Sequence, residues 1–342
     1  MSDALRDRMG RHITTLRVSV IDRCNLRCVY CMPAGGVPLS PRTALLRFEE
    51  IAEVVAAAAD LGVTRVKLTG GEPLLRRDIH RLVAMLAAID GIDDLSLTTN
   101  GTLLSGLARP LRAAGLHRVT VSLDTLRPDR FRRITGGIAP SDEGPPKATP
   151  PAPASEPLER VLAGIEAARC AGLAPIKVNV VALRGVNDDE FLDFARLTLD
   201  RPIEVRFIEL MRIGHRARAD AAWFLPMAEV RDRLRALGRL LPLRSSKREG
   251  PAVRFRFAGA RGTVGFIAPI TEPFCHRCNR LRLTSHGVLR ACLLAGGEVG
   301  LKAALRPRPD RAALRAALRE AVRLKPAHHA GAGTTPMSLI GG

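Results

Sequence analysis

The sequence predicts an α/β fold, namely a partial (βα)6 TIM-like barrel followed by a smaller C-terminal α+β domain. Between residues 16 and 208, β-like runs alternate with helical runs, a pattern typical of a parallel sheet covered by helices. Beyond Met211 the pattern changes, because two β-like runs then follow one another. We therefore expect domains at residues 1–215 and 216–342, with ligands at the C-terminal ends of the barrel strands.

The individual elements follow from the apolar runs between turn residues. The barrel strands are expected at residues 16–21, 63–68, 95–98, 118–123, 176–182 and 203–208. The helices between and beyond them are expected at residues 48–60, 79–89, 105–114, 128–134, 158–171 and 188–199. The C-terminal part should contain helices at 227–237 and 310–323 and strands at 253–257 and 262–267. A Pro-rich stretch at about 137–157 is expected to be an inserted surface loop.

Composition excludes several classes of protein. With 342 residues, 46% of them hydrophobic, the chain can bury a large core. It contains no apolar stretch of about eighteen residues, and its charged amino terminus lacks the apolar core of a signal peptide. We therefore expect a cytoplasmic protein with no membrane partner.

The net charge of +19 suggests a polyanionic partner. The chain has only one Trp and one Tyr, whereas a single-stranded nucleic-acid binder normally places aromatic side chains among its basic residues. We therefore favour a small phosphorylated substrate and expect no nucleic-acid partner.

The first cysteine group consists of Cys24, Cys28 and Cys31, in a C-x(3)-C-x(2)-C spacing directly after the first β-like run. Three thiolates leave one iron of a cubane [4Fe–4S] cluster without a protein ligand, whereas electron-transfer ferredoxins normally supply four. An iron with an open position can bind a substrate. The alternatives are a zinc knuckle, which usually draws on two separated cysteine pairs, or three buried thiols. A separate cysteine, Cys170, is expected to be a buried structural thiol.

Polar residues and glycines follow the next strands. The segment Thr69-Gly70-Gly71-Glu72-Pro73 ends the second strand, where paired glycines allow a ligand to approach the backbone and Glu72 is placed to receive a cation. Further polar residues at strand ends are Thr98, Asn100, Ser122 and Asp124. Each is also suited to capping a helix, but their recurrence at successive strand ends favours a ligand pocket.

The second cysteine group has a C-x(2)-C-x(13)-C spacing and consists of Cys275, Cys278 and Cys292. Its spacing fits an iron–sulfur cluster and a Cys3His zinc site with His276 or His286 equally well. Arg280 and Arg282 alternate on one face of a strand-like segment, where two guanidinium forks are suited to gripping phosphates. A solvated basic strand face is the alternative.

The first cysteine group, with Tyr30 before its third cysteine, resembles the radical S-adenosylmethionine (SAM) signature. Together, the two groups resemble the GTP 3′,8-cyclase (MoaA) family of molybdenum cofactor biosynthesis. The resemblance extends from about Leu16 to the terminal Gly-Gly and is carried by TGGEPLLRRD, VSLD, RFIELM, FCHRCNRLR and KPAHH.

The resemblance implies a radical SAM lyase that converts GTP to (8S)-3′,8-cyclo-7,8-dihydroguanosine 5′-triphosphate. In such an enzyme a 5′-deoxyadenosyl radical abstracts the ribose 3′ hydrogen, and C3′ then attacks guanine C8. The implied partners are a cyclic pyranopterin monophosphate synthase downstream, a reductant such as a flavodoxin or ferredoxin, and a second copy of the chain in a homodimer. The alternatives are another radical SAM enzyme, such as a peptide-modifying maturase, and a non-catalytic metal-containing nucleic-acid binder.

The resemblance also implies roles for single residues. Two [4Fe–4S] clusters would be held by Cys24, Cys28 and Cys31 and by Cys275, Cys278 and Cys292. SAM would be bound by Tyr30, Gly71, Ser122 and Met211. GTP would be bound by Arg17, Lys67, Thr98, Lys177, Arg280, Leu281 and Arg282. The catalytic residues would be Arg17, Gly341 and Gly342. Lys67 stands where the family usually has Arg, so a point-charge contact would replace a bidentate phosphate contact.

Overall fold

The computed structural model describes residues 4–33, 35–38, 40–136, 157–214, 222–244, 250–329, 331–333 and 335–341. Nearly all of the Pro-rich stretch predicted at 137–157 lies outside the described residues, as do Gly342 and the predicted domain boundary at 215. None of the described helices is long and apolar enough to cross a membrane.

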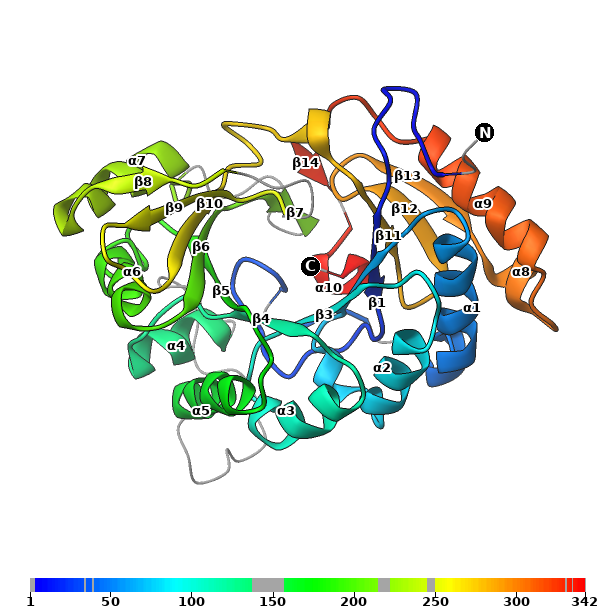
Figure 1. The fold of residues 1–342 in the computed structure, drawn as a ribbon, viewed down its shortest axis with the longest axis horizontal. Helices are drawn as coiled ribbons and strands as arrows, with labels where there is room; N and C mark the ends of the chain where they lie inside the picture. The colour runs from blue at the N-terminus through cyan, green and yellow to red at the C-terminus, as the bar shows by residue number, and fades with distance from the viewer. Residues whose placement is uncertain are drawn as a thin grey trace.

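One curved sheet forms the framework of the described chain (Figure 1). Its strands are β1 (Thr15–Ser19), β2 (Arg65–Thr69), β3 (Asp94–Thr99), β4 (Arg118–Ser122), β5 (Ile176–Ala182), β6 (Ile203–Glu209), β8 (Leu240–Pro242), β9 (Val253–Phe257), β10 (Thr263–Ile267), β11 (Arg280–Leu283), β12 (Val288–Cys292) and β13 (Gly296–Gly300). The strand order is β13-β12-β11-β1-β2-β3-β4-β5-β6-β10-β9-β8. From β11 through to β10 every neighbouring pair is parallel, which confirms the predicted barrel-like α/β fold.

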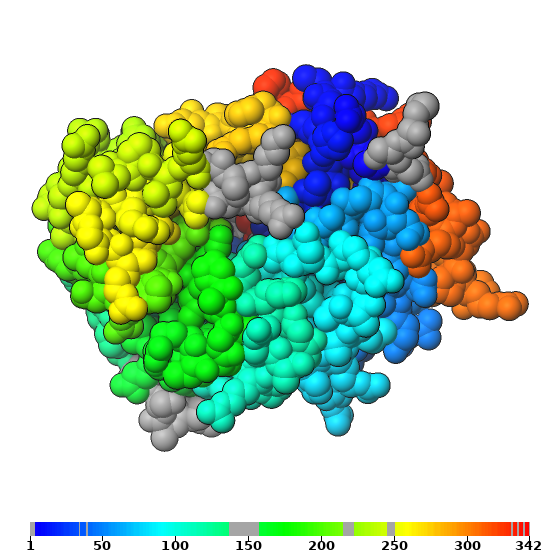
Figure 2. Space-filling model, viewed as in Figure 1, coloured from blue at the N-terminus to red at the C-terminus, as the bar shows by residue number. Residues whose placement is uncertain are grey.

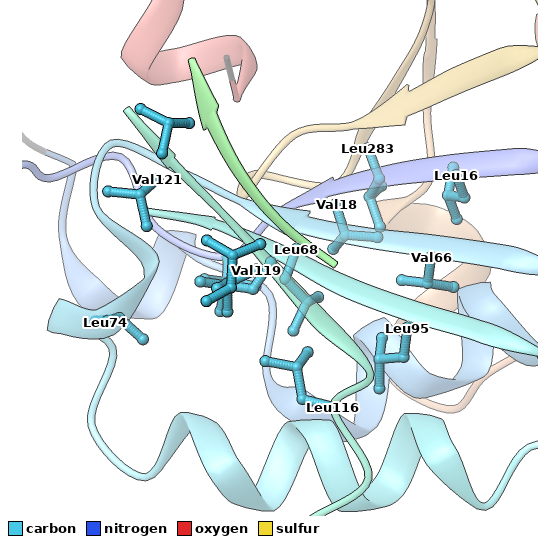
Figure 3. Close-up of a cluster of buried hydrophobic side chains, with 14 of the residues drawn as sticks. Leu16, Val18, Val66, Leu68, Leu74, Leu95, Leu116, Val119, Val121 and Leu283 are labelled. Atoms are coloured by element: carbon cyan, nitrogen blue, oxygen red, sulfur yellow. The ribbon is translucent and has the colours of Figure 1, made fainter. Parts of the chain in front are cut away.

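The outer face of the sheet is apolar because nearly every second residue of its parallel strands is aliphatic or aromatic. Figure 3 shows part of this layer, in which Leu16 and Val18 of β1 lie near Val66 and Leu68 of β2. These side chains are almost completely buried. Since strand side chains alternate between two faces, the intervening residues of the same strands face the inside of the barrel.

Helices cover the outside of the sheet (Figure 1). They are α1 (Phe48–Ala59), α2 (Ile79–Ala87), α3 (Leu104–Ala113), α4 (Pro128–Thr135), α5 (Pro157–Cys170), α6 (Phe191–Asp200), α7 (Met227–Leu234), α8 (Lys302–Leu305) and α9 (Arg311–Arg323). Local signals set their starts: Pro128 occupies the first turn of α4, and the Asp310 side chain accepts a hydrogen bond from Ala313 N to cap α9.

The residues beyond Met211 add strands to both edges of the barrel sheet. Strand β10 pairs with β6, whereas β11 pairs with β1 on the other side. Helix α9 packs against α1, and the N-terminal segment (blue in Figure 2) lies beside these C-terminal elements (orange). The C-terminal part therefore completes the walls of the barrel interior.

The C-terminal tail enters the ring of strands. The two-residue strand β14 (Ala332–Gly333) pairs with β7 (Arg212–Ile213), which follows β6 closely. The short helix α10 (Met337–Ile340) then lies inside the ring (Figure 1).

Cys170 is exposed, so the prediction of a buried thiol was wrong. Helix α5 buries Leu158, Val161, Gly164 and Ala168, and a residue two positions beyond Ala168 lies on the opposite side of the helix. The Cys170 thiol instead contacts the Glu166 carboxylate at 3.5 Å.

Phe207 tests the packing that holds the barrel wall to its helices. Its ring lies 5.2 Å from that of Phe191 and 6.2 Å from that of Phe266, between centroids. We expect Phe207→Ala to lower the free energy of unfolding by about 3–5 kcal/mol through the cavity it leaves. The half-exposed Leu162 is the control, and Leu162→Ala should change that free energy by less than about 0.5 kcal/mol. Equal shifts of the two denaturant midpoints would contradict this account.

Candidate functional site

Polar side chains on the inner face of the barrel form rows that run across neighbouring strands. One row places Arg282 of β11 beside Arg17 of β1, then Lys67 of β2 and Ser96 of β3. A second row joins Thr98 to Thr120, Lys177 and Glu204. A packed barrel interior normally contains bulky branched residues, so this polar lining indicates a ligand space.

The thiol cavity, of about 210 Å³, lies at the C-terminal ends of the barrel strands. All three cysteines of the first group line it, together with all four residues predicted to bind SAM: Tyr30, Gly71, Ser122 and Met211. The structure therefore brings together seven residues from four separate parts of the chain. Its position at the strand ends is where the βα pattern predicted a ligand.

The first cysteine group lies on a loop held against the glycines that follow β2. Leu26 N and Asn100 Nδ2 approach the Cys24 Sγ at 3.4 and 3.8 Å. A Cβ on Gly71 would lie 2.3 Å from the Arg23 carbonyl oxygen and 2.9 Å from Cys24 N. Only glycine fits there without displacing the loop.

The first cysteine group fits an iron–sulfur cluster by its chemistry. Burial raises the pKa of Cys24 to about 11 and that of Cys31 to about 12, so the thiolates need a bound cation to persist. In the described ranges, no three His, Cys, Asp or Glu side chains form a group able to hold a single metal ion. A cubane cluster does not require such a group, because each of its cysteine ligands binds a different iron.

Tyr30 and Asp124 connect the cysteine loop to the ends of β4 and β5. The Tyr30 hydroxyl donates to Asp124 Oδ2 at 2.5 Å, and Val181 N donates to Oδ1 at 2.8 Å. Burial raises the pKa of Asp124 to about 6, although both hydrogen bonds oppose the shift. The pair therefore fixes one wall of the thiol cavity.

Glu72 does not face a ligand, so its predicted availability to a cation was wrong. Its side chain is fully buried and is absent from the cavity lining. Its carboxylate accepts hydrogen bonds from Leu74 N at 2.9 Å, Thr99 Oγ1 at 2.7 Å and Asn100 N at 2.7 Å. Glu72 therefore ties the loop after β2 to the end of β3.

The cation cavity, of about 240 Å³, lies deeper in the barrel. Eight cationic side chains line it: Arg17, Arg65, Lys67, Arg118, Lys177, Arg206, Arg280 and Arg282. It shares six lining residues with the thiol cavity: Thr98, Ser122, Asn179, Ile208, Met211 and Met337. The two cavities are therefore adjoining parts of one interior.

The cations of this cavity are held in place by polar neighbours. Lys67 Nζ donates to Thr120 Oγ1 at 2.9 Å, and Lys177 Nζ lies 3.2 Å from a Glu204 carboxylate oxygen. Burial, followed by repulsion from neighbouring arginines, lowers the pKa of Lys67, and burial and Arg280 lower that of Arg282 to about 10. A bound polyanion would remove much of this repulsion.

Six of the seven residues predicted to bind GTP line the cation cavity, and Leu281 does not. The Leu281 side chain is buried in the apolar core, on the opposite face of β11 from Arg280 and Arg282. Only its backbone is available to a ligand.

Sequence reasoning missed three cations of the cavity: Arg65, Arg118 and Arg206. Arg206 is buried and donates to Asn179 Oδ1 at 2.9 Å. A signal for them existed, because each alternates with aliphatic residues in a strand buried on its outer face.

The second cysteine group lies where β11 begins and β12 ends, near the N-terminal ends of β1 and β2. The Lys325 ammonium donates to the Arg280 and Ala291 carbonyls of these strands at 2.9 and 2.7 Å. Arg11 Nη1 donates to the Cys275 carbonyl at 2.6 Å. The two cysteine groups therefore flank the cation cavity from opposite ends of the barrel.

The histidines weighed as zinc ligands are not both near this group. His286 Nε2 lies 2.8 Å from the Ser40 hydroxyl and 3.7 Å from the Asp22 carboxylate, beside the loop that follows β1. His276 is exposed and lines a separate groove. The position of His286 excludes the Cys3His zinc site in which it would be the fourth ligand.

The described part of the tail reaches the barrel interior. The Gly341 carbonyl accepts a hydrogen bond from Arg282 Nη1 at 2.5 Å. A Cβ on Gly341 would lie 2.4 Å from Thr69 Oγ1 and 2.9 Å from the Ser19 Cβ, and its φ is +81°. Both the space and the backbone angle therefore require glycine.

Two parts of the chain match known protein families. Residues 18–198 match the Radical SAM superfamily, and residues 203–331 match the family described as Molybdenum Cofactor Synthesis C. The GTP 3′,8-cyclase of Moorella thermoacetica is 48% identical over 327 residues, covering 95% of both chains. That of Pelotomaculum thermopropionicum is 48% identical over 328 residues, with the same coverage.

Among solved structures, Streptococcus suis SuiB has a similar fold, with a TM-score of 0.57 at 15% identity. The match covers 83% of this chain and 62% of SuiB, and at this identity it concerns the fold alone. The barrel, the three-cysteine loop and the match over residues 18–198 define a radical SAM protein. By its identity to relatives over nearly its whole length, the chain belongs to the GTP 3′,8-cyclase family.

Gly71→Ala tests the fit of the cysteine loop to the loop after β2. We expect this variant to lose the iron of the first cysteine group, because the new Cβ would collide with backbone atoms of Arg23 and Cys24. Gly106→Ala is the matched control, since a Cβ at Gly106 has no atom within 4 Å. Iron content and SAM binding, measured anaerobically, should fall only in Gly71→Ala. Unchanged SAM binding in that variant would contradict the assignment.

Proposed function

We propose that this chain converts GTP to (8S)-3′,8-cyclo-7,8-dihydroguanosine 5′-triphosphate, the first step of molybdenum cofactor biosynthesis. The observation that carries the proposal is the junction of the thiol cavity with the cation cavity through six shared residues. A cofactor in the first cavity would thereby meet a polyanionic substrate in the second. Membership of the GTP 3′,8-cyclase family supports this choice of substrate.

On the cofactor side, Cys24, Cys28 and Cys31 would hold a [4Fe–4S] cluster with one iron open to SAM. This cluster and SAM, when bound, supply one-electron radical chemistry. Tyr30, Gly71, Ser122 and Met211 line the same cavity and would orient SAM toward the cation cavity. Their contribution is to hold the reacting atoms in a fixed geometry.

On the substrate side, the cations of the barrel interior would neutralise the triphosphate of GTP. Arg17 and Lys67 lie next to one another in the strand register, and Lys177 faces the same cavity from β5. Arg280 and Arg282 add two guanidinium groups from β11. Eight cations point into the interior, where a duplex or a long single strand has no room, which disfavours the nucleic-acid alternative.

The second cysteine group would hold a second [4Fe–4S] cluster. This cysteine group lies beyond the cation cavity, where β11, the strand that carries Arg280 and Arg282, begins. A cluster there with one open iron could contact the guanine of GTP while the triphosphate remains among the arginines. Gly341, together with Gly342, would close the barrel interior on the side where the C-terminal tail enters. The reductant and a second copy of the chain, as partners, stay predictions.

The proposal is tested with anaerobically reconstituted protein given GTP, SAM and dithionite. Mass spectrometry should detect 5′-deoxyadenosine and the cyclised nucleotide, and two cubane clusters should give about eight irons per chain. Cys275→Ser should lose GTP conversion while keeping the first cluster, whereas Cys24→Ser should lose SAM cleavage. Normal turnover of GTP by Cys275→Ser would rule out the second-cluster assignment.

Arg17→Met tests the substrate side alone. Hydrogen bonds to charged groups contribute about 1.5–3 kcal/mol, so the affinity for GTP should fall by about 10- to 100-fold. The exposed Arg201, outside both cavities, provides the control variant Arg201→Met. Calorimetric titration with GTP measures both variants. Wild-type affinity in Arg17→Met would contradict the placement of the triphosphate.

Removal of residues 341–342 tests the tail. The shortened chain loses the hydrogen bond from Arg282 Nη1 to Gly341 O, which orients a guanidinium of the cation cavity. We expect GTP conversion to be lost while the iron content, measured on the same sample, stays that of the full chain. Full conversion by the shortened chain would exclude a role for the tail in the reaction.

A further inference from the structure

Lys325 is a buried lysine near the second cysteine group. Its side chain is only 7% exposed, although lysine is rarely buried without a charged partner. In the described part of the chain, no carboxylate forms an ion pair with it. The groups facing it that carry negative charge when deprotonated are the thiols of Cys278 and Cys292, and the cation that faces it is Arg11.

The hydrogen bonds of Lys325 fix its ammonium between two strands. Two of its three donors are used by the carbonyls of Arg280, on β11, and Ala291, on β12. Cys278 lies just before the first of these strands and Cys292 ends the second. Iron-bound thiolates would be permanently negative and would keep the ammonium protonated.

The two cysteine groups have opposite electrostatic surroundings. The side chains that face the thiols of the first group include the carboxyl groups of Asp124 and Glu72. In the second group, the charged side chains that face Cys278 are the cations Arg280 and Lys325. The first site therefore disfavours additional negative charge, and the second site accepts it.

We propose that Lys325 raises the reduction potential of the cluster held by the second cysteine group, through an ammonium fixed beside Cys278 and Cys292. This inference rests on the proposed function, which assigns a cluster to that group. Nearby charge and hydrogen bonds to the sulfurs set the potential of such clusters. A cation favours the reduced cluster because reduction adds one negative charge. Lys325 is thus a positioning and tuning residue, and it lines neither the thiol cavity nor the cation cavity.

The test is a potentiometric titration with dithionite, followed by electron paramagnetic resonance, on the anaerobically reconstituted full chain. Added SAM identifies the signal of the first cluster, because SAM binds its open iron. Lys325→Met removes the charge, and Lys325→Gln removes the charge while keeping a hydrogen-bond donor. Lys302→Met removes an exposed lysine of α8 and serves as the matched control.

In both Lys325 variants we expect the midpoint potential of the second cluster to become more negative, while that of the first cluster stays unchanged. Lys302→Met should shift neither. An unchanged second potential, an equal shift of both clusters, or loss of the second cluster's iron in both variants would overturn the inference. Wild-type protein with only about four irons per chain would instead refute the second-cluster assignment itself, before any variant is compared.

Discussion

The alternation of side chains along the parallel strands is the constraint on which the rest of this structure depends. In β1, Leu16 and Val18 pack outward while Arg17 faces the interior, and the same pattern recurs in β2 with Lys67. Because the strands are parallel and in register, one alternation produces both the apolar layer under the helices and the cation cavity. A slip of one residue would exchange the two faces, so the core fixes the positions of the cations.

The charge distribution inside the barrel connects folding to ligand binding. Buried cations repel one another, and desolvation lowers the pKa values of Arg17, Lys67 and Arg206. Neighbours such as Glu204 and Asn179 compensate only in part. A polyanion that binds only the folded chain stabilises it by mass action. The interior therefore gives up some stability in the ligand-free chain for a preformed triphosphate site.

Much of this architecture could be predicted from the sequence, because six long apolar runs alternate with helical runs and both cysteine groups have short spacings. Strand β5, for example, matches its prediction residue for residue. The errors have physical causes. The structural role of Glu72 could not be predicted, because the three donors that hydrogen-bond its carboxylate come together only in the folded chain. Short strands such as β13 contain too few apolar residues to be recognised in the sequence. Arg206 went unnoticed because it belongs to no motif, and its alternation with apolar residues along β6 was the only signal for it.

SAM and the ribose of GTP would meet at the junction between the two cavities. Hydrogen transfer across this junction can be followed by giving the reconstituted enzyme GTP that carries deuterium at the ribose 3′ position. Mass spectrometry of the 5′-deoxyadenosine formed would then report the transfer. We expect one deuterium in 5′-deoxyadenosine and none at the ribose 3′ carbon of the cyclised nucleotide. Unlabelled 5′-deoxyadenosine beside fully labelled nucleotide would contradict this expectation.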